Sequence, residues 1–387
     1  MPKTLCRFDS GGNNGPREQK VAPPTNSGGA RRTKGFIQTR YLGSKRRLLP
    51  WLESIFQTLE FDSAVDVFGG TGAVSWALKR LGKSVVFNDA LEANAIGARA
   101  VVANDGVHLP HSAARTLFER ARGVAYADVV ERHYAGVFYV AEEDRWIDTV
   151  AQNAHRLTSV EERSLALHAL FQACLMKRPF NLFHRANLSL RLASVQRSFG
   201  NKATWDTPFE ALFLRALDEA NAAVFRGARP ARVLSCDALT CPLDADLVYL
   251  DPPYVRADGA SFHYGDGYHF LEGLADYGGW ASRIDASRRH KPLSLPRSAF
   301  EDARTAPAAL EALFDRAERV RHLVFSYRAD GLPSVGELVH ALERRGRRVT
   351  KYERAQGYAL STRRSGELVL VATRDQPSSS VAARSSE

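Results

Sequence analysis

The sequence predicts an α/β fold, in which a mostly parallel sheet carries helices on both faces and is interrupted by a largely helical insertion. Two observations predict it. Short apolar strands alternate with helical segments in two separated parts of the chain, and the stretch between these parts has helical periodicity alone. In such sheets, ligands bind beyond the carboxyl ends of the strands. The polar residues that follow the strands are therefore the first candidates for a functional site.

The first strand runs into a glycine-rich turn. Segment 63–82, SAVDVFGGTGAVSWALKRLG, combines an apolar strand, the loop Phe68-Gly69-Gly70-Thr71-Gly72 and an amphipathic helix. Glycine has no Cβ, so the backbone of this loop can approach a ligand closely. Ser75 stands where a dinucleotide fingerprint would have its third glycine. The loop predicts a cofactor of the adenosine type and does not by itself exclude nicotinamide.

Three later strands each end near an aspartate. Asp89 follows the strand in segment 83–91, and Asp237 and Asp251 follow two strands in segment 231–254. The Asp89 carboxylate can accept hydrogen bonds from both hydroxyls of a ribose, and Asp237 can accept one from an adenine amine. Further strands are predicted at 320–331, 347–353 and 367–373.

Ahead of the first strand, the segment RYLGSKRRLLPWL (40–52) places an aromatic residue and a lysine four positions apart. Tyr41 could flank the apolar parts of a cofactor, and Lys45 could hold its carboxylate. A basic start of an exposed helix would give the same pattern.

The motif Asp251-Pro252-Pro253-Tyr254 predicts the chemistry. Proline cannot donate a ladder hydrogen bond, so the chain must leave the sheet there. The exocyclic amine of adenine or cytosine is a poor nucleophile, because its lone pair is delocalised into the ring. The Asp251 carboxylate and the Pro252 carbonyl, held rigidly, could accept hydrogen bonds from its two N–H groups. The lone pair would then point at a methyl donor. Tyr254 could stack on an extruded base.

In this order, the segments from Tyr41 to Lys45 and from Phe68 to Gly72, then Asp89 and the motif at Asp251, resemble the Dam-type (alpha-group) adenine-specific DNA methyltransferases. The resemblance covers about residues 36–375. It implies a Rossmann-like methyltransferase sheet, S-adenosylmethionine as cofactor, adenine in double-stranded DNA as substrate and a target-recognition domain inserted before Asp251. By position, Tyr41, Lys45, Asp89 and Asp251 correspond to cofactor-contacting residues of the family, and Asp237 to its acid near the cofactor adenine. Tyr41 stands where relatives often have tryptophan.

The domain boundaries follow from these segments. We expect a disordered basic lead-in at 1–34, a catalytic domain formed by 35–95 and 231–375, a helical target-recognition insertion at 96–230, and a disordered tail at 376–387. Segment 261–280, which is rich in aromatic residues and glycine, is predicted to be a mobile loop that closes over the extruded base, with Tyr264 and Tyr268 as candidate contacts.

Within the insertion, the stretch 163–205 contains no acidic residue. Basic groups can contact phosphates, while asparagine and arginine can read base edges. The predicted DNA-binding residues are Lys177, Arg178, Arg185, Asn187, Arg191, Arg197 and Lys202. The alternative interpretation is a solvated helix face packed on a core of phenylalanines.

The composition limits the class of protein. A net charge of +10 fits a polyanionic partner, and no apolar run reaches the length of a membrane span. The four cysteines form no metal-binding pattern, which predicts reduced thiols in the cytoplasm and no metal site. The N-terminus lacks the apolar core of a secretory signal. A single subunit would suffice chemically, so we expect a monomer, with any cognate restriction endonuclease acting separately.

Several alternatives remain open from the sequence. The same motifs would serve methylation of cytosine N4 in DNA or of adenine in RNA. A protein-glutamine methyltransferase is disfavoured, because the related motif there begins with asparagine. A nicotinamide oxidoreductase is opposed by the missing third glycine, and a non-catalytic nucleic-acid binder by the intact Asp251 and Tyr254.

Overall fold

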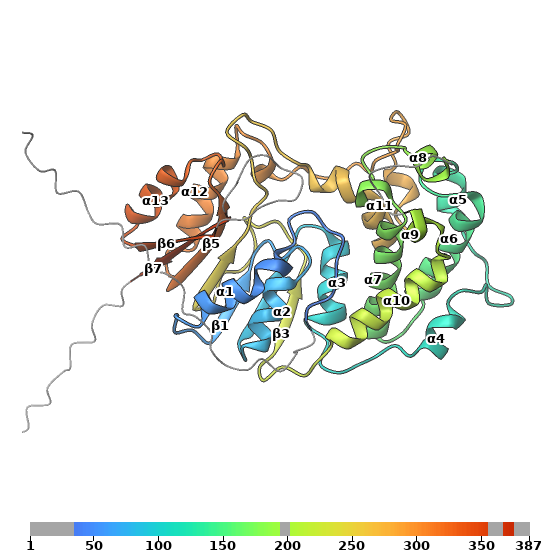
Figure 1. The fold of residues 1–387 in the computed structure, drawn as a ribbon, viewed down its shortest axis with the longest axis horizontal. Helices are drawn as coiled ribbons and strands as arrows, with labels where there is room; N and C mark the ends of the chain where they lie inside the picture. The colour runs from blue at the N-terminus through green and yellow to red at the C-terminus, as the bar shows by residue number, and fades with distance from the viewer. Residues whose placement is uncertain (1–34, 194–201, 355–366, 375–387) are drawn as a thin grey trace, which may run out of the picture.

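A computed structural model describes residues 35–193, 202–354 and 367–374 of the 387-residue chain. Its centre is a seven-stranded sheet in the order β3-β2-β1-β4-β5-β7-β6, in which β7 alone runs antiparallel to its neighbours (Figure 1). The strands are β1 (Ser63–Asp66), β2 (Ser84–Asn88), β3 (Ala231–Leu234), β4 (Leu247–Leu250), β5 (His322–Arg328), β6 (Arg348–Arg354) and β7 (Glu367–Thr373). All the strands predicted from the sequence are confirmed, as is the α/β class.

Side chains alternate between the two faces of the sheet, so each strand contributes to two cores. Ala64 and Leu247 pack with α1 (Leu49–Phe56), α2 (Ala73–Arg80) and α3 (Glu92–Val101) on one face. Val65 and Val248 pack with α12 (Ala306–Arg316) and α13 (Val335–Glu343) on the other. Figure 1 shows these two layers in the left half of the molecule. Because β1 pairs in parallel with both β2 and β4, the carboxyl ends of these three strands meet at one edge.

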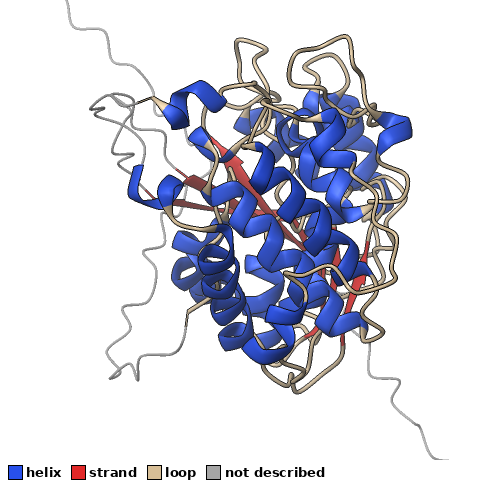
Figure 2. Cartoon of the chain, turned by 90° about the vertical axis from the view of Figure 1, so that its right-hand side faces the viewer, coloured by secondary structure: helices blue, strands red, loops and turns tan. Residues whose placement is uncertain are grey.

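The described residues of the stretch predicted as an insertion, 96–193 and 202–230, are largely helical and lie mainly beside the sheet (Figure 1). Its helices are α4 (His111–Thr116), α5 (Val129–His133), α6 (Ala141–His155), α7 (Val160–Met176), α8 (Leu188–Leu192), α9 (Lys202–Asp206) and α10 (Phe209–Ala223), with the short 3-10 helix η2 (Pro179–Asn181). Figure 2 views the molecule from this side, where helices predominate. The longest, α7, has buried residues all around and packs between α3, α6 and α10.

Segment 261–280 differs from its prediction as a mobile loop. Tyr264–Ala275 form the helix α11, most of which is buried, and Tyr268 is 1% exposed. Trp280, also buried, donates a hydrogen bond from Nε1 to the hydroxyl of Tyr134 in the insertion. This segment follows the catalytic motif in sequence and packs with the insertion in space. The aromatic and glycine residues serve close packing: a Cβ at Gly273 would lie 2.0 Å from the Trp280 ring.

Candidate active site

A cavity of about 290 Å³ opens at the carboxyl ends of β1, β2, β3 and β4. It brings together most of the residues that were predicted from separate sequence motifs. Those that line it are Tyr41, Lys45, Phe68, Gly69, Gly70, Asp89, Asp237, Asp251 and Pro253. Three predicted residues are not part of the lining, although each is next in sequence to a residue that is: Gly72, Pro252 and Tyr254. The cavity therefore has the location predicted for a cofactor site in a parallel sheet.

The glycine loop needs glycine for two different reasons. A Cβ at Gly69 would lie 2.1 Å from the ring of Phe87 on β2, so no side chain fits there. Gly70 and Gly72 have φ angles of +52° and +79°, which side chains disfavour. Gly72 is the N-cap residue of α2, and its amide donates to the Gly69 carbonyl at 2.8 Å. The result is a tight turn that presents bare backbone to the cavity.

Asp89 links the glycine loop to the loop that follows β2. Its Oδ2 accepts the Gly70 amide at 2.8 Å, and its Oδ1 accepts the Leu91 amide at 2.9 Å. Burial raises the pKa of Asp89, and these backbone hydrogen bonds oppose the rise. The neighbouring Asn88 ties β2 to the turn after β3, since its side-chain amide donates to the carbonyl of Cys236 at 3.0 Å.

Asp66 is a functional candidate that the sequence prediction missed. It ends β1, it lines the cavity, and its Oδ2 accepts a hydrogen bond from Ser75 at 2.7 Å. Among the described residues, nothing donates to its buried Oδ1. Burial is the main reason that the pKa of Asp66 rises to about 7. The signal was available, because Asp66 closes its strand just as Asp89 and Asp251 follow theirs.

The catalytic candidate Asp251 lies directly after β4 in a network of three side chains. Lys45 Nζ is 2.9 Å from Asp251 Oδ1 and donates to the Tyr254 hydroxyl, also at 2.9 Å. The Tyr254 hydroxyl in turn donates to Asp251 Oδ1. Burial raises the pKa of Asp251, and Lys45 opposes that rise without overcoming it. Within the part of the chain that the structure describes, these contacts all use Oδ1, which leaves Oδ2 for a donor in the cavity.

Packing within the protein holds the prolines and Tyr254 in place. Pro252 is buried, and the Tyr254 ring packs edge-on against Tyr327 of β5, with ring centres 5.8 Å apart. The Tyr327 hydroxyl donates to the Pro333 carbonyl at 2.7 Å. The backbone that carries Asp251 is thus held in place by the neighbouring strand.

Another wall of the cavity comes from residues outside the motifs, of which Tyr264 alone was a candidate from the sequence. They belong to α11, to the segment before the 3-10 helix η4 (Ala299–Glu301) and to the end of η4 itself, and they are Tyr264, Gly265, Glu272, Leu295, Pro296, Arg297, Ser298 and Glu301. Tyr264 stacks on Tyr41 with ring centres 5.7 Å apart. Glu301 accepts the Tyr264 amide at 3.0 Å. These contacts join segments that are far apart in sequence, which is why local patterns did not reveal them.

Three of the predicted DNA-binding cations are buried inside the insertion. Lys177 pairs with Glu143 at 2.8 Å, and Arg191 pairs with the same carboxylate. Arg178 is 1% exposed, lies over the ring of Phe138, and donates to the Arg185 carbonyl at 2.8 Å. Their charged groups are used within the protein, so the structure argues against direct DNA contacts by Lys177, Arg178 and Arg191.

The other predicted DNA-binding residues differ among themselves. Arg185 is exposed at the surface of the insertion. Asn187 is half-buried, and its side-chain oxygen accepts a hydrogen bond from Arg178. Lys202 is exposed and pairs with Asp206 one helical turn away. Arg197 lies outside the described residues, as do the predicted disordered segments 1–34 and 376–387.

Comparison with known proteins identifies the family. The family model of the D12 class N6 adenine-specific DNA methyltransferases matches residues 41–273, more than half of the chain. The chain belongs to this family. The matched region begins at Tyr41 and includes the glycine loop, the catalytic motif and most of α11.

Three similar proteins are named as methyltransferases or as a methylase. The chain is 25% identical over 335 residues to the type II methyltransferase M2.HphI of Haemophilus parahaemolyticus, covering 84% of this chain and 93% of the relative. It is 24% identical to the type II methyltransferase M.NlaIII of Neisseria lactamica, covering 79% and 88%. It is 22% identical to the modification methylase StsI of Streptococcus sanguinis, covering 79% of this chain and 46% of that relative. The prediction of an adenine-specific DNA methyltransferase is confirmed.

No helix in the described ranges is long and apolar enough to cross a membrane. In the same ranges, no cluster of three or more His, Cys, Asp or Glu side chains is placed to hold a metal ion.

Proposed function

We propose that this protein transfers a methyl group from S-adenosylmethionine to the exocyclic N6 amine of adenine in double-stranded DNA. The observation that carries the proposal is the Asp251 carboxylate, buried at the edge of the cavity and oriented by Lys45 and Tyr254. The family supports adenine in DNA as the substrate.

The cavity suits S-adenosylmethionine, a cofactor with a positive charge, a ribose and an adenine. The Asp66 carboxylate lines the cavity and supplies negative charge for the cofactor's cationic groups. Asp89 is placed to accept from ribose hydroxyls, and the exposed Asp237 to accept from the adenine amine. Tyr41 and Phe68 supply apolar contact. When bound, the cofactor supplies a methyl group on a positively charged sulfur.

The chain's own residues prepare the amine. Asp251 Oδ2 and the Pro252 carbonyl accept hydrogen bonds from the two N–H groups of the amine. These hydrogen bonds withdraw the lone pair from the ring and point it toward the cofactor. The Lys45 ammonium favours the ionised, accepting form of Asp251, although burial raises the pKa of this carboxyl. Because the prolines fix the backbone, little reorganisation is needed when the base arrives.

The amine of adenine is inaccessible within a stacked duplex, so the base must be extruded into the cavity. We assign stacking on the base to Tyr254 of the catalytic motif and to Tyr264, which lines the cavity. On the insertion, the exposed Arg185 and Lys202 are the described cations that we assign to DNA phosphates.

The names of the relatives support a biological role. Two are type II methyltransferases and one is a modification methylase. We therefore infer that this protein is the modification component of a restriction–modification system. It would act in the cytoplasm as a monomer, separately from a cognate endonuclease, because each modification event needs one cavity and one DNA site.

The test is methyl transfer from labelled S-adenosylmethionine to mixed-sequence duplex DNA, followed by nucleoside analysis. We expect label in N6-methyladenine, and its loss in Asp251→Asn. Label in N4-methylcytosine would keep the mechanism and replace the base, and label in RNA alone would replace the nucleic acid. No label in any nucleic acid, from protein that binds S-adenosylhomocysteine, would contradict the proposal.

A further inference from the structure

Helix α11 is held on one side by the insertion. The amide of Phe183 donates to the Gly267 carbonyl at 2.9 Å, and the Phe183 ring stacks on Phe270 with ring centres 4.8 Å apart. Near the other end of α11, the ring nitrogen Nε2 of His155 lies 2.9 Å from the carbonyl oxygen of Leu274. These contacts run along the helix and attach α11 to the insertion.

On another side, α11 holds the loop that carries Tyr41 and Lys45. The Leu42 amide donates to the Tyr268 hydroxyl at 2.8 Å. The Tyr268 ring stacks on Tyr41 with ring centres 4.4 Å apart and an angle of 11° between the rings. Tyr41 and Leu42 both line the cavity. One side chain of α11 therefore fixes a cavity loop through both its hydroxyl and its ring.

One turn further along, Glu272 holds a second cavity loop. Its Oε1 accepts the Ala93 amide at 2.8 Å, and its Oε2 accepts the Glu92 amide at 3.2 Å. These amides open α3, whose N-cap residue Leu91 supplies no side-chain cap. An α-helix leaves its first amides without internal partners, so this carboxylate supplies the missing acceptors from another part of the chain. The loop just before α3 carries Asp89, the proposed ribose ligand.

We propose that α11 couples DNA bound by the insertion to cofactor bound at the sheet edge, with Tyr268 and Glu272 as positioning residues that set the two cavity loops. The inference rests on the proposed function. Each ligand favours the arrangement in which α11 is seated on both loops. Binding of the first ligand includes the free energy needed to order that arrangement. The second ligand binds to an already ordered protein and therefore binds more tightly. By linkage, cofactor must strengthen DNA binding by the same factor that DNA strengthens cofactor binding.

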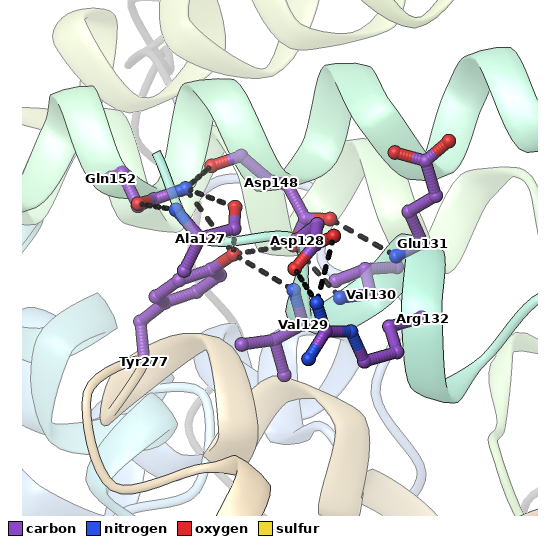
Figure 3. Close-up of polar contacts among 9 residues, drawn as sticks. All are labelled: Ala127, Asp128, Val129, Val130, Glu131, Arg132, Asp148, Gln152 and Tyr277. Carbon is purple, nitrogen blue, oxygen red and sulfur yellow. Dashed lines mark hydrogen bonds and ion pairs between the residues drawn. The ribbon is translucent and has the colours of Figure 1, made fainter. Parts of the chain in front are cut away.

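Figure 3 shows a matched pair of control residues, Asp148 in the insertion and Tyr277 shortly after α11. Asp148 on α6 accepts the amides of Val130 and Glu131 at 2.8 and 3.0 Å, so it holds the start of α5 as Glu272 holds that of α3. The hydroxyl of Tyr277 donates to Asp148. Both controls are buried, and neither lines the cavity. Asp148→Asn and Tyr277→Phe therefore remove the same chemical groups without touching a cavity loop.

The experiment measures the dissociation constant of S-adenosylhomocysteine, which cannot donate a methyl group, with and without a saturating duplex that the wild type methylates. We expect DNA to tighten binding by about 10-fold in the wild type. In Tyr268→Phe and Glu272→Gln this ratio should fall toward one. The KM for cofactor should rise while kcat at saturating cofactor changes less. Asp148→Asn and Tyr277→Phe should keep the wild-type ratio, even where they lower the melting temperature.

Two results would overturn the proposal: a wild-type ratio of one, or ratios in Tyr268→Phe and Glu272→Gln that match those of the controls. Failure of the proposed function would look different. In that case the wild type would methylate no DNA, whereas DNA-free binding of S-adenosylhomocysteine would still show whether Tyr268 and Glu272 hold the cofactor loops.

Discussion

The active-site cavity and the helical insertion each contain a buried lysine–carboxylate pair, and the two pairs have almost the same geometry. In the cavity, Lys45 and Asp251 are 2.9 Å apart, with side chains 6% and 14% exposed. In the insertion, Lys177 and Glu143 are 2.8 Å apart, with side chains 4% and 15% exposed. Distance and burial alone would give both pairs the same role.

The difference lies in how far each carboxylate is neutralised. Burial by itself would raise the pKa of Glu143, but hydrogen bonds from Arg191 and Lys177 outweigh it, and the pKa is lowered. Asp251 has one cation instead of two, burial outweighs that cation, and its pKa is raised. The Glu143 carboxylate is thus neutralised by cations of the protein itself, and the insertion pair has a structural role. In the proposed mechanism, the cavity pair keeps an acceptor, Asp251 Oδ2, for a donor that arrives with the substrate.

The largest contrast is expected from Asp251→Asn. The amide keeps the shape of the side chain and cannot act as a charged acceptor for the amine. We expect methyl transfer to fall by about 10³-fold, in line with the loss of one preorganised electrostatic contact. The free energy of unfolding should fall by about 1–2 kcal/mol, less than for Glu143→Gln, because the variant leaves one buried cation without a counter-charge and also removes a carboxylate whose charge is disfavoured by burial. Single-turnover kinetics and urea denaturation measure the two quantities. A variant that failed to fold would contradict this account of the pair.

Glu143→Gln is expected to show the reverse behaviour. It leaves Lys177 and Arg191 buried without a counter-charge, which should lower the free energy of unfolding by about 3 kcal/mol. The folded fraction should retain wild-type kcat, since Glu143 does not line the cavity. Denaturation and active-site titration on the same preparation check both statements. Loss of kcat per folded molecule would show that this pair also serves catalysis.

The two pairs should also respond to pH with opposite signs. The lowered pKa of Glu143 contributes stability above its usual value of 4.5, and this contribution is lost as the pH falls through the lowered pKa. The raised pKa of Asp251 contributes stability below its usual value of 3.8, and this contribution is lost as the pH rises through the raised pKa. We expect the stability advantage of the wild type over Glu143→Gln to shrink on acidification, and that over Asp251→Asn to shrink as pH rises. Parallel slopes in denaturation between pH 4 and 8 would contradict this.

The same comparison explains which parts of the site the sequence could predict. Strands and the residues that end them are local patterns, so Asp89, Asp237 and Asp251 were found, and Asp66 could have been found by the same rule. Glu272 could not, because the amides it holds lie 179 and 180 residues away.

The buried cations of the insertion show a second limit. Lys177 lies in a stretch without acids, which suggested a DNA-binding face, but its partner Glu143 lies 34 residues upstream on α6. Local charge says nothing about whether a distant segment supplies the counter-charge. Hydrophobic periodicity also failed to orient α7, because buried residues surround this helix on all sides.

The smallest expected effect distinguishes exposed from buried cations in DNA binding. Arg185→Ala removes an exposed guanidinium and leaves its backbone carbonyl in place for Arg178. We expect DNA affinity to fall a few-fold and the slope of log K against log salt to decrease by about 1, as for one lost phosphate contact. Arg132→Ala is the control, since Arg132 is also an exposed arginine of the insertion, lies outside the acid-free stretch and pairs with Asp128. It should leave the slope unchanged. If both variants lowered the slope equally, the +10 net charge would be acting as a diffuse field, and the acid-free stretch would have no special part in binding DNA.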